Sequence, residues 1–179
     1  NFACENNLPL VIATTGFSDE QIKKITDAAQ KIPVFFSFNM SLGINLLAEL
    51  CRKAATVLDG FDIEIIEKHH NQKIDAPSGT AILLANEIND ELNGKMTYEY
   101  DRHSKSQKRT KTEIGMHAVR GGTIVGEHEV IFAGRDEIIT LSHSARSKEI
   151  FAVGAVNAAL FVSEKPAGIY SMKELVLEK

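Results

Sequence analysis

The sequence predicts an α/β protein in two parts, with parallel strands first and a mixed, largely antiparallel sheet after them. Over residues 8 to 39, an apolar run, a segment with helical periodicity and a second apolar run follow one another. This strand–helix–strand order is typical of a parallel sheet. From residue 41 on, a long helix precedes strand segments that are separated by glycine-containing turns, which is typical of an α+β domain.

The first part is predicted from short-range signals. Leu8 to Gly16 reads as a buried strand that runs into a turn, because the apolar run is too short for a helix and ends in small residues. Ser18 is a favourable N-cap for the helix that follows, and Pro33 stops that helix. Residues 33–39 then form a second apolar strand. Strand, helix and strand in this order are the βαβ signature of a parallel, doubly wound sheet, so this segment is expected to be the end of an α/β domain.

The second part begins with a helix over Ser41 to Leu58, which Gly60 ends. Residues 61–70 alternate apolar and acidic side chains and are predicted to form a strand. A polar loop follows at 71–77, and a second helix covers 78–92.

The remaining chain is predicted to be a loop, three strands and a final helix. Residues 98–111 are dense in Lys and Arg and are predicted to form an exposed, mobile loop. Gly and Asp residues punctuate the strand segments after it, so these are predicted to form an antiparallel meander. The strands span 112–121, 123–134 and 136–146, the helix spans 148–162, and a tail follows.

Composition and charge restrict the function. The chain has 179 residues, 44% of them hydrophobic, 25% of them charged, and a net charge of -4. No apolar run reaches the ~20 residues of a membrane span, and nucleic-acid binding usually leaves a basic footprint that is absent here. Cys4 and Cys51 form no CxxC motif, which favours two free thiols and a cytoplasmic location.

The strongest chemical signal is the segment from Glu67 to Thr80. A strand delivers two histidines to its C-terminal end, a loop carries a lysine, and Pro77 sets up a helix start whose backbone amides are expected to face outward. A helix N-terminus with small and hydroxyl side chains favours anions, and a nearby lysine completes a carboxylate pocket. The residues of this predicted pocket are His69, His70, Lys73, Ser78, Gly79 and Thr80.

Other interpretations of these residues remain open at this stage. Adjacent histidines on a strand point to opposite faces, so at most one need be functional, and a Ser-Gly-Thr run after proline is often only a helix cap. A metal site and a nucleic-acid patch are two further hypotheses, although no HxxxH spacing supports the first and no interleaved aromatic residue supports the second. Their candidate residues are His69, His70, His117, His128 and His143 for the metal, and Lys105, Lys108, Arg109 and Lys111 for the patch.

The motif resembles that of a known family. HHNQKIDAPSGTA, over residues 69–81, is similar to the HHxxKxDAPSGTA signature of the dihydrodipicolinate reductases. ATTG at 13–16, FSFNMSLGIN at 36–45 and VRGGTIVGEHEVIF at 119–132 resemble further segments of that family in the same order. The resemblance runs from about residue 8 to the C-terminus.

The resemblance implies an enzyme of lysine and diaminopimelate biosynthesis. In that family a hydride passes from NADPH or NADH to a cyclic, unsaturated dicarboxylate derived from 4-hydroxy-tetrahydrodipicolinate. It implies proton donation by His69 and Lys73, substrate contacts from His70, Lys73, Ser78, Gly79 and Thr80, and contacts to the nicotinamide end of the cofactor from Ala13, Thr14, Thr15, Ser37, Phe38, Asn39 and Met40. No metal is implied.

The resemblance also implies a division of the chain. Residues 1–40 are expected to be residual elements of the nucleotide-binding domain, and 41–146 a substrate-binding domain whose sheet forms a homotetramer. Residues 147–179 are expected to pack back on the nucleotide-binding part.

One departure from the family pattern affects the cofactor site. Members of the family open with a glycine-rich strand–turn–helix that holds the pyrophosphate, and neither G-x-G-x-x-G nor G-x-x-G-x-M-G occurs in this sequence. The chain is therefore expected to be a fragment. A non-catalytic dicarboxylate-binding module, or an inactive fragment, is the alternative to a reductase.

Overall fold

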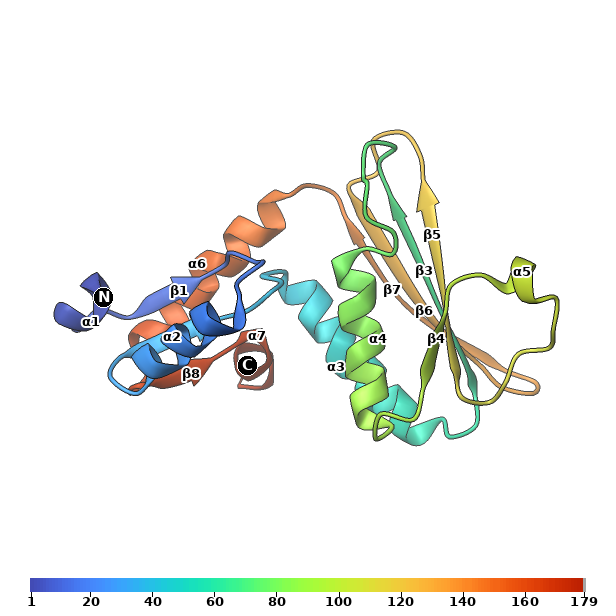
Figure 1. The fold of residues 1–179 in the computed structure, drawn as a ribbon, viewed down its shortest axis with the longest axis horizontal. Coiled ribbons are helices and arrows are strands. Elements are labelled where there is room, and N and C mark those ends of the chain that lie inside the picture. The colour runs from blue at the N-terminus through green and yellow to red at the C-terminus, as the bar shows by residue number, and fades with distance from the viewer. Residues whose placement is uncertain (179) are drawn as a thin grey trace. The chain divides into compact units, whose positions relative to one another are not determined.

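The computed structural model describes residues 1–178, which form two compact units (Figure 1). The first unit contains residues 1–46 together with the chain from residue 148 on, and the second contains residues 47–147. Along the sequence the boundaries fall within helix α3 and just before helix α6. Among the described residues, no helix is both long and apolar enough to span a bilayer.

The first unit is built on a parallel sheet with strand order β1-β2-β8. The predicted strand–helix–strand order is confirmed, and the first helix begins with a capping box in which Ser18 and Gln21 exchange backbone and side-chain hydrogen bonds. Its elements are α1 (Phe2–Glu5), β1 (Leu10–Ile12), α2 (Asp19–Ala29), β2 (Pro33–Phe36), α6 (Glu149–Ser163), β8 (Gly168–Tyr170) and α7 (Met172–Leu177).

The C-terminal segment supplies one strand and part of the core of this unit. Strand β8 pairs with β2, so that Val34 lies opposite Ile169. Helix α6 packs directly on the chain after β2, because a Cβ added at Gly154 would lie 1.7 Å from the Met40 carbonyl oxygen. The tail, to which the sequence assigned no element, therefore contains both β8 and α7. These C-terminal elements share a hydrophobic cluster with β2 and the chain after it, and its buried residues are Phe35, Met40, Ala158, Val162, Met172 and Leu175.

The second unit is a five-stranded sheet with two helices on one face (Figure 1). Apolar side chains of α3 and α4, among them Leu47, Cys51 and Leu84, pack with Ile65 and Phe132 of the sheet. Burial raises the pKa of the Cys51 thiol to about 12. The elements are α3 (Leu42–Val57), β3 (Asp62–His69), α4 (Gly79–Glu91), β4 (Thr97–Glu99), α5 (Arg102–Lys105), β5 (Glu113–Arg120), β6 (Gly126–Ala133) and β7 (Ile138–Ala145).

The predicted antiparallel meander is wrong, although the mixed character of the sheet is confirmed. The strand order is β4-β5-β3-β6-β7, so β3 lies between β5 and β6. Strand β5 pairs in parallel with β3 and β4, whereas β6 pairs in antiparallel fashion with β3 and β7. The glycines at 121–122 therefore end a strand that does not pair with its successor, and only β6 and β7 form a hairpin.

The segment predicted to be a mobile loop is anchored to the sheet. It contains part of β4 and the short helix α5. The Arg102 guanidinium lies 2.6 Å from a carboxylate oxygen of Glu64 on β3, and Arg109 donates to the Ile63 and Glu113 carbonyl oxygens. Positive side chains of the loop are thus paired with acidic groups of the sheet.

Candidate active site

Strand β3 delivers a carboxylate and an imidazole to the same buried face. Its residues alternate between half-buried and buried, so Glu67 and His69 share a face with Ile63 and Ile65. Glu67 has 0% relative exposure and His69 has 9%. His70 follows the end of the strand and is half-buried. The adjacent histidines are thus in different surroundings.

Glu67 receives hydrogen bonds from three different segments. Its Oε2 lies 2.6 Å from His69 Nδ1, and its Oε1 accepts the Ser78 backbone amide at 3.0 Å. The two terminal nitrogens of Arg120 on β5 donate to the two carboxylate oxygens at 2.8 and 2.7 Å, in a bidentate pair. One buried carboxylate therefore joins the strand, the start of α4 and the neighbouring strand β5.

These contacts keep Glu67 ionised. Burial alone would raise the pKa of this carboxyl, but the hydrogen bonds from Arg120, His69 and the Ser78 amide outweigh burial and lower the pKa below its usual value. An ionised Glu67 accepts hydrogen bonds only, so His69 presents a protonated Nδ1 to it.

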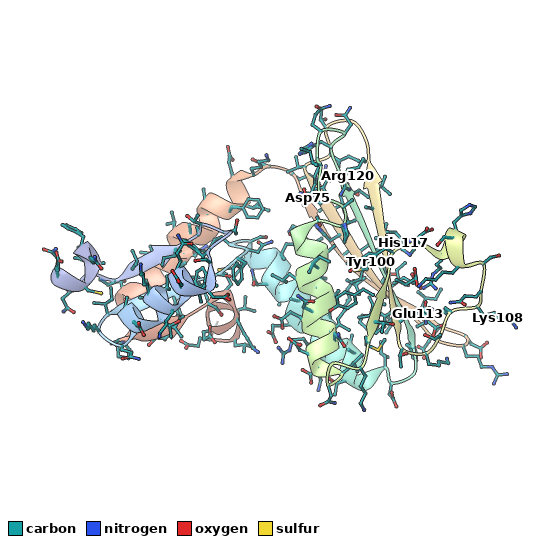
Figure 2. The ribbon with its side chains drawn as sticks, in the orientation of Figure 1. Asp75, Tyr100, Lys108, Glu113, His117 and Arg120 are labelled. Carbon is teal, nitrogen blue, oxygen red and sulfur yellow. The ribbon has the colours of Figure 1, made fainter. Side chains whose placement is uncertain are left out.

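The loop from 71 to 77 is fixed at both ends. The Asn71 amide donates to the Gly122 carbonyl oxygen, and Arg120 donates to the Asp75 carbonyl oxygen at 2.6 Å. Figure 2 labels Arg120 and Asp75 near the same end of the sheet. Within the loop, Lys73 Nζ lies 2.9 Å from Asp75 Oδ1, and this contact lowers the pKa of Asp75. Lys73 is less exposed than its partner, since their side chains are 22% and 58% exposed.

Helix α4 starts at the site, as predicted, with Ser78 as its N-cap. The Ser78 hydroxyl accepts the Ala81 amide. The prediction that the Ser78 amide faces outward is wrong, because Glu67 accepts it. Gly79 and Thr80 are the first two residues of the helix, where positive dipole charge collects. An added Cβ at Gly79 would meet no atom within 4 Å, so open space lies beside this position.

His128 on β6 forms the other side of the His69 ring. The two rings are 5.2 Å apart in an edge-to-face arrangement, and His128 Nε2 lies 3.1 Å from the Ser78 hydroxyl. Burial, followed by the charge of His69, lowers the pKa of His128 to about 4, so this ring is neutral near pH 7. His143 lies directly opposite on β7, and burial lowers its pKa as well.

The residues predicted to contact the cofactor lie in the other unit, in the loops after β1 and β2. The two strands are parallel and Ile12 lies opposite Phe36, so both loops leave from the carboxyl edge of the sheet, where nucleotides bind in doubly wound folds. The segment Ala13, Thr14 and Thr15 is exposed, as is Phe38, whereas Ser37 and Asn39 are half-buried and Met40 is buried in the core.

A cleft of about 560 Å³ opens between Pro77 and Tyr100. Met116, His117 and Ala118 of β5 also line it. None of the sequence-predicted substrate residues is among the residues that line this cleft. It therefore lies beside the predicted pocket and does not coincide with it.

The two competing hypotheses find no support in this geometry. The five histidines do not all converge, because His117 bonds to Glu64 on the sheet face opposite α3 and α4, while His69 and His128 lie on the face that α3 and α4 cover. Among the described residues, no group of three potential ligands could hold a metal ion. Lys105 and Arg109 are paired with Glu99 and Asp62, which removes them from a nucleic-acid patch.

Sequence reasoning assigned no role to Glu67 or Arg120, and it considered His128 only as a ligand of the hypothetical metal site. The alternation of β3, if followed beyond Ile65, places a carboxylate on the buried face, which is an unusual location that normally requires partners. That signal could have identified Glu67. Arg120 and His128 could not be found in this way, since they lie on other strands.

Two family models match nearly the whole chain. The family model described as "Dihydrodipicolinate reductase, C-terminus" matches residues 43–176, and the corresponding "N-terminus" model matches residues 1–40. A 4-hydroxy-tetrahydrodipicolinate reductase of Caldanaerobacter subterraneus is 56% identical over 97% of this chain and 69% of its own length. One of Clostridium novyi is 50% identical over 100% of this chain and 71% of its own length.

A solved structure is similar over most of the chain. It is described as a dipicolinate-bound dihydrodipicolinate reductase from Paenisporosarcina sp. TG-14, with a TM-score of 0.78 and 29% identity. The match covers 97% of this chain and 66% of that one, so the chain spans about two thirds of that protein. Together with the two family models, these relatives show that the chain belongs to the dihydrodipicolinate reductase family of NAD(P)H-dependent oxidoreductases in lysine and diaminopimelate biosynthesis.

Proposed function

We propose that this chain carries the substrate site for reduction of 4-hydroxy-tetrahydrodipicolinate to tetrahydrodipicolinate with NAD(P)H. One observation carries the proposal: the end of β3, the Lys73 loop and the start of α4 meet around Glu67. The relatives named above carry this activity in their names, and one structural relative is described as binding dipicolinate.

The dicarboxylate binds at the start of α4 in this proposal. The first turn of α4 contains Gly79 and Thr80, and open space lies beside Gly79, a setting that favours a carboxylate. Lys73 supplies a cation from the adjacent loop, and its present partner Asp75 is more than half exposed. A substrate carboxylate therefore competes with a solvated side chain for Lys73. His70, half-buried at the end of β3, lies at the other side of the loop and is the remaining proposed contact.

The proposed chemistry combines a hydride with a proton. The nicotinamide supplies the hydride, and the loops at 13–15 and 37–40 suit its binding because they leave from the carboxyl edge of parallel strands. Loss of the 4-hydroxyl group of the substrate as water gives a conjugated imine, and addition of a hydride to that imine leaves an electron-rich ring that must gain a proton. Lys73 and His69 are the proposed donors, and general acid catalysis of this kind contributes on the order of 10²-fold or more. The ammonium of Lys73 also stabilises the developing negative charge.

The face of the five-stranded sheet opposite α3 and α4 is proposed to form the interface of a homotetramer. By register, Ile66, Val119, Ile131 and Ile138 lie on that face, and Val119 and Ile138 are 45% and 67% exposed. Burial of such apolar side chains favours association. Light scattering after gel filtration is expected to give a tetramer for the chain and a smaller species for Ile131→Lys. A monomeric wild type would contradict this assembly.

Calorimetric titration with pyridine-2,6-dicarboxylate, a planar mimic of the substrate, tests the proposed site. We expect saturable binding that weakens at least about tenfold in Lys73→Ala, or about 1.4 kcal/mol. Lys95→Ala is the matched control, since Lys95 is an exposed lysine beyond the other end of α4. A folded wild type that does not bind, or equal binding by Lys73→Ala, would contradict the proposal.

Hydride transfer separates the reductase from the alternative, a non-catalytic dicarboxylate-binding module. Oxidation of NADPH or NADH on addition of freshly generated substrate supports the reductase. Dicarboxylate binding without any oxidation of either nucleotide would favour the binding module for this chain.

A further inference from the structure

We infer that Glu67 is a positioning residue that fixes the tautomer of His69, so that Nε2 is the ring atom that delivers the proton. The inference rests on the proposed function for its catalytic meaning, but its structural content concerns His69 alone. Glu67 does not touch the substrate in this scheme. It acts through the imidazole.

The geometry defines which ring nitrogen carries the proton. His69 Nδ1 lies 2.6 Å from the Glu67 carboxylate, which accepts and does not donate. Neutral His69 is therefore held as the Nδ1–H tautomer, because the hydrogen bond at one nitrogen decides the state of the other. Nε2 then carries the lone pair in the neutral ring and the second proton in the charged ring.

Gly126 lies beside His69 Nε2. A Cβ added at Gly126, the first residue of β6, would lie 3.1 Å from His69 Nε2, which is tighter than an ordinary contact. Glycine at 126 thus leaves space beside the nitrogen that must exchange a proton. During reduction the N–H bond at Nε2 breaks, its electron pair stays on the imidazole, and the ring becomes neutral while the reduced substrate gains the proton.

Glu67 does not take up the His69 proton, because its own partners keep it anionic. Arg120 donates to both of its oxygens, and the Ser78 amide donates to one of them. The other titratable or charged groups near the His69 ring are Arg120, which lies opposite His69 on β5, and the neutral His128 on β6, with His143 behind it on β7. Among the described residues in contact with this ring, Glu67 is the one carboxylate. Its removal therefore frees the choice of tautomer.

NMR spectroscopy measures the tautomer of His69 directly. In the full chain with ¹⁵N-labelled histidine, two-bond nitrogen–proton correlation spectra at about pH 8, well above the usual histidine range, report which nitrogen of His69 is protonated. We expect Nδ1–H in the wild type and a majority of Nε2–H in Glu67→Gln. Glu64→Gln is the matched control, because Glu64 lies on the same strand and bonds to His117 and Arg102. It is expected to leave His69 unchanged.

Two further measurements keep the test decisive. If Glu67→Gln fails to fold, Glu67→Asp retains the charge for Arg120 but withdraws the carboxylate from Nδ1 by one methylene, and it is expected to lose the Nδ1–H preference. Wild-type His69 in the Nε2–H form, or an unchanged Nδ1–H form in a folded Glu67 variant, would overturn the inference. Dipicolinate binding by the wild type is measured separately. Loss of binding with Nδ1–H retained would refute the proposed function alone, and the reverse result would refute the positioning role alone.

Discussion

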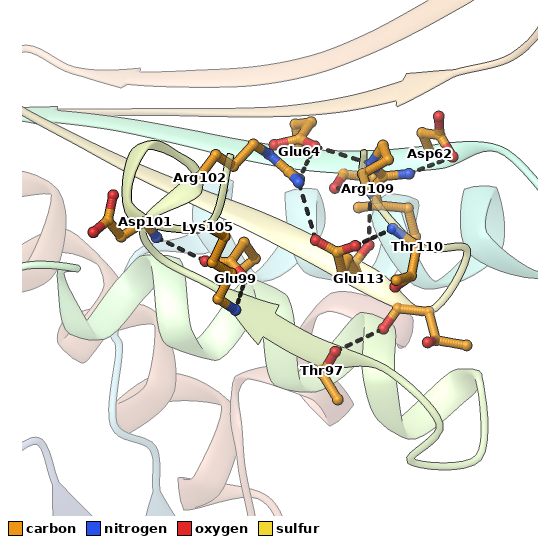
Figure 3. A network of polar contacts seen from close by, with 12 residues as sticks. Asp62, Glu64, Thr97, Glu99, Asp101, Arg102, Lys105, Arg109, Thr110 and Glu113 are labelled. Carbon is orange, nitrogen blue, oxygen red and sulfur yellow. Dashed lines mark hydrogen bonds and ion pairs between the residues drawn. The ribbon is translucent and has the colours of Figure 1, made fainter. Parts of the chain in front are cut away.

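Strand β3 carries two carboxylates that each pair with a histidine and arginine, on opposite faces of one sheet. Glu67, with 1% side-chain exposure, holds His69 and Arg120 on the helix-covered face. Glu64, with 23% exposure, pairs with His117 on the opposite face of the sheet. It also pairs there with Arg102 and Arg109 (Figure 3). The groups are chemically alike, so burial and the third partner make the difference: Glu67 also accepts the Ser78 amide at the start of α4, whereas Glu64 fastens a loop.

The largest expected difference between the clusters concerns stability. Glu67→Gln leaves the Arg120 guanidinium, which is mostly buried, without its bidentate partner, and breaking such a pair costs about 3 kcal/mol or more. Glu64→Gln removes a more solvated carboxylate and is expected to cost about 1 kcal/mol or less. Urea unfolding of the two variants checks this. Equal losses would show that burial does not distinguish the clusters.

The second expected difference concerns pH. The pKa of His128 is lowered from 6.5 to about 4 in the folded chain, so the unfolded chain binds more protons between those values and stability rises with pH there. The contribution of His128 to the free energy of unfolding is complete above about pH 6.5 and is lost as the pH falls toward 4. When the pH falls from about 7 to about 5, the free energy of unfolding is expected to decrease by about 2 kcal/mol because of His128.

Thermal unfolding at these two pH values is expected to show a smaller pH dependence in His128→Gln than in the wild type. His117→Gln serves as the comparison, because His117 is 42% exposed and belongs to the Glu64 cluster. If His117→Gln reduced the pH dependence and His128→Gln preserved it, the pH dependence would come from His117 and not from His128.

The smallest expected effect is screening by salt. Arg102 is 32% exposed where it pairs with Glu64 and Glu113, so its pairs are worth about 1 kcal/mol or less and weaken in ~1 M salt, where the Debye length is about 3 Å. Arg102→Ala is therefore expected to lose little stability, and less still in high salt. A loss that persists undiminished in high salt would mean that this cluster is effectively buried.

Local signals predicted much of the fold. The caps at Ser18 and Ser78 placed the starts of α2 and α4 within one residue, because capping involves only neighbours in sequence. The predicted stop at Pro33 was less accurate, since α2 already ends at Ala29. The order of β5, β3 and β6 was missed, since β3 inserts between strands that follow one another later in the chain. Such pairing depends on contacts far apart in sequence. Strand β8 has three residues and gains its partner β2 in the same way.

In the candidate site, too, residues close together in the sequence were predicted and contacts between distant segments were missed. His69, Lys73 and the start of α4 lie within one short segment and were predicted together. Glu67 lies in that segment too, but its role depends on Arg120 of β5, and the ring beside His69 comes from β6. The sequence-based expectation that the Ser78 amide is open to a ligand was wrong for the same reason, because a side chain eleven residues earlier accepts it.

The most direct test of the central claim asks which of the two clusters on β3 binds a dicarboxylate. Backbone amide spectra of the assigned ¹⁵N-labelled chain, recorded during titration with pyridine-2,6-dicarboxylate, separate them residue by residue. We predict saturable shifts at His69, Lys73 and Gly79, with the resonances of Glu64 and Arg102 unchanged. Saturable shifts centred on Glu64 and Arg102, or none at Gly79, would contradict the assignment of the buried Glu67 cluster as the organiser of the substrate site.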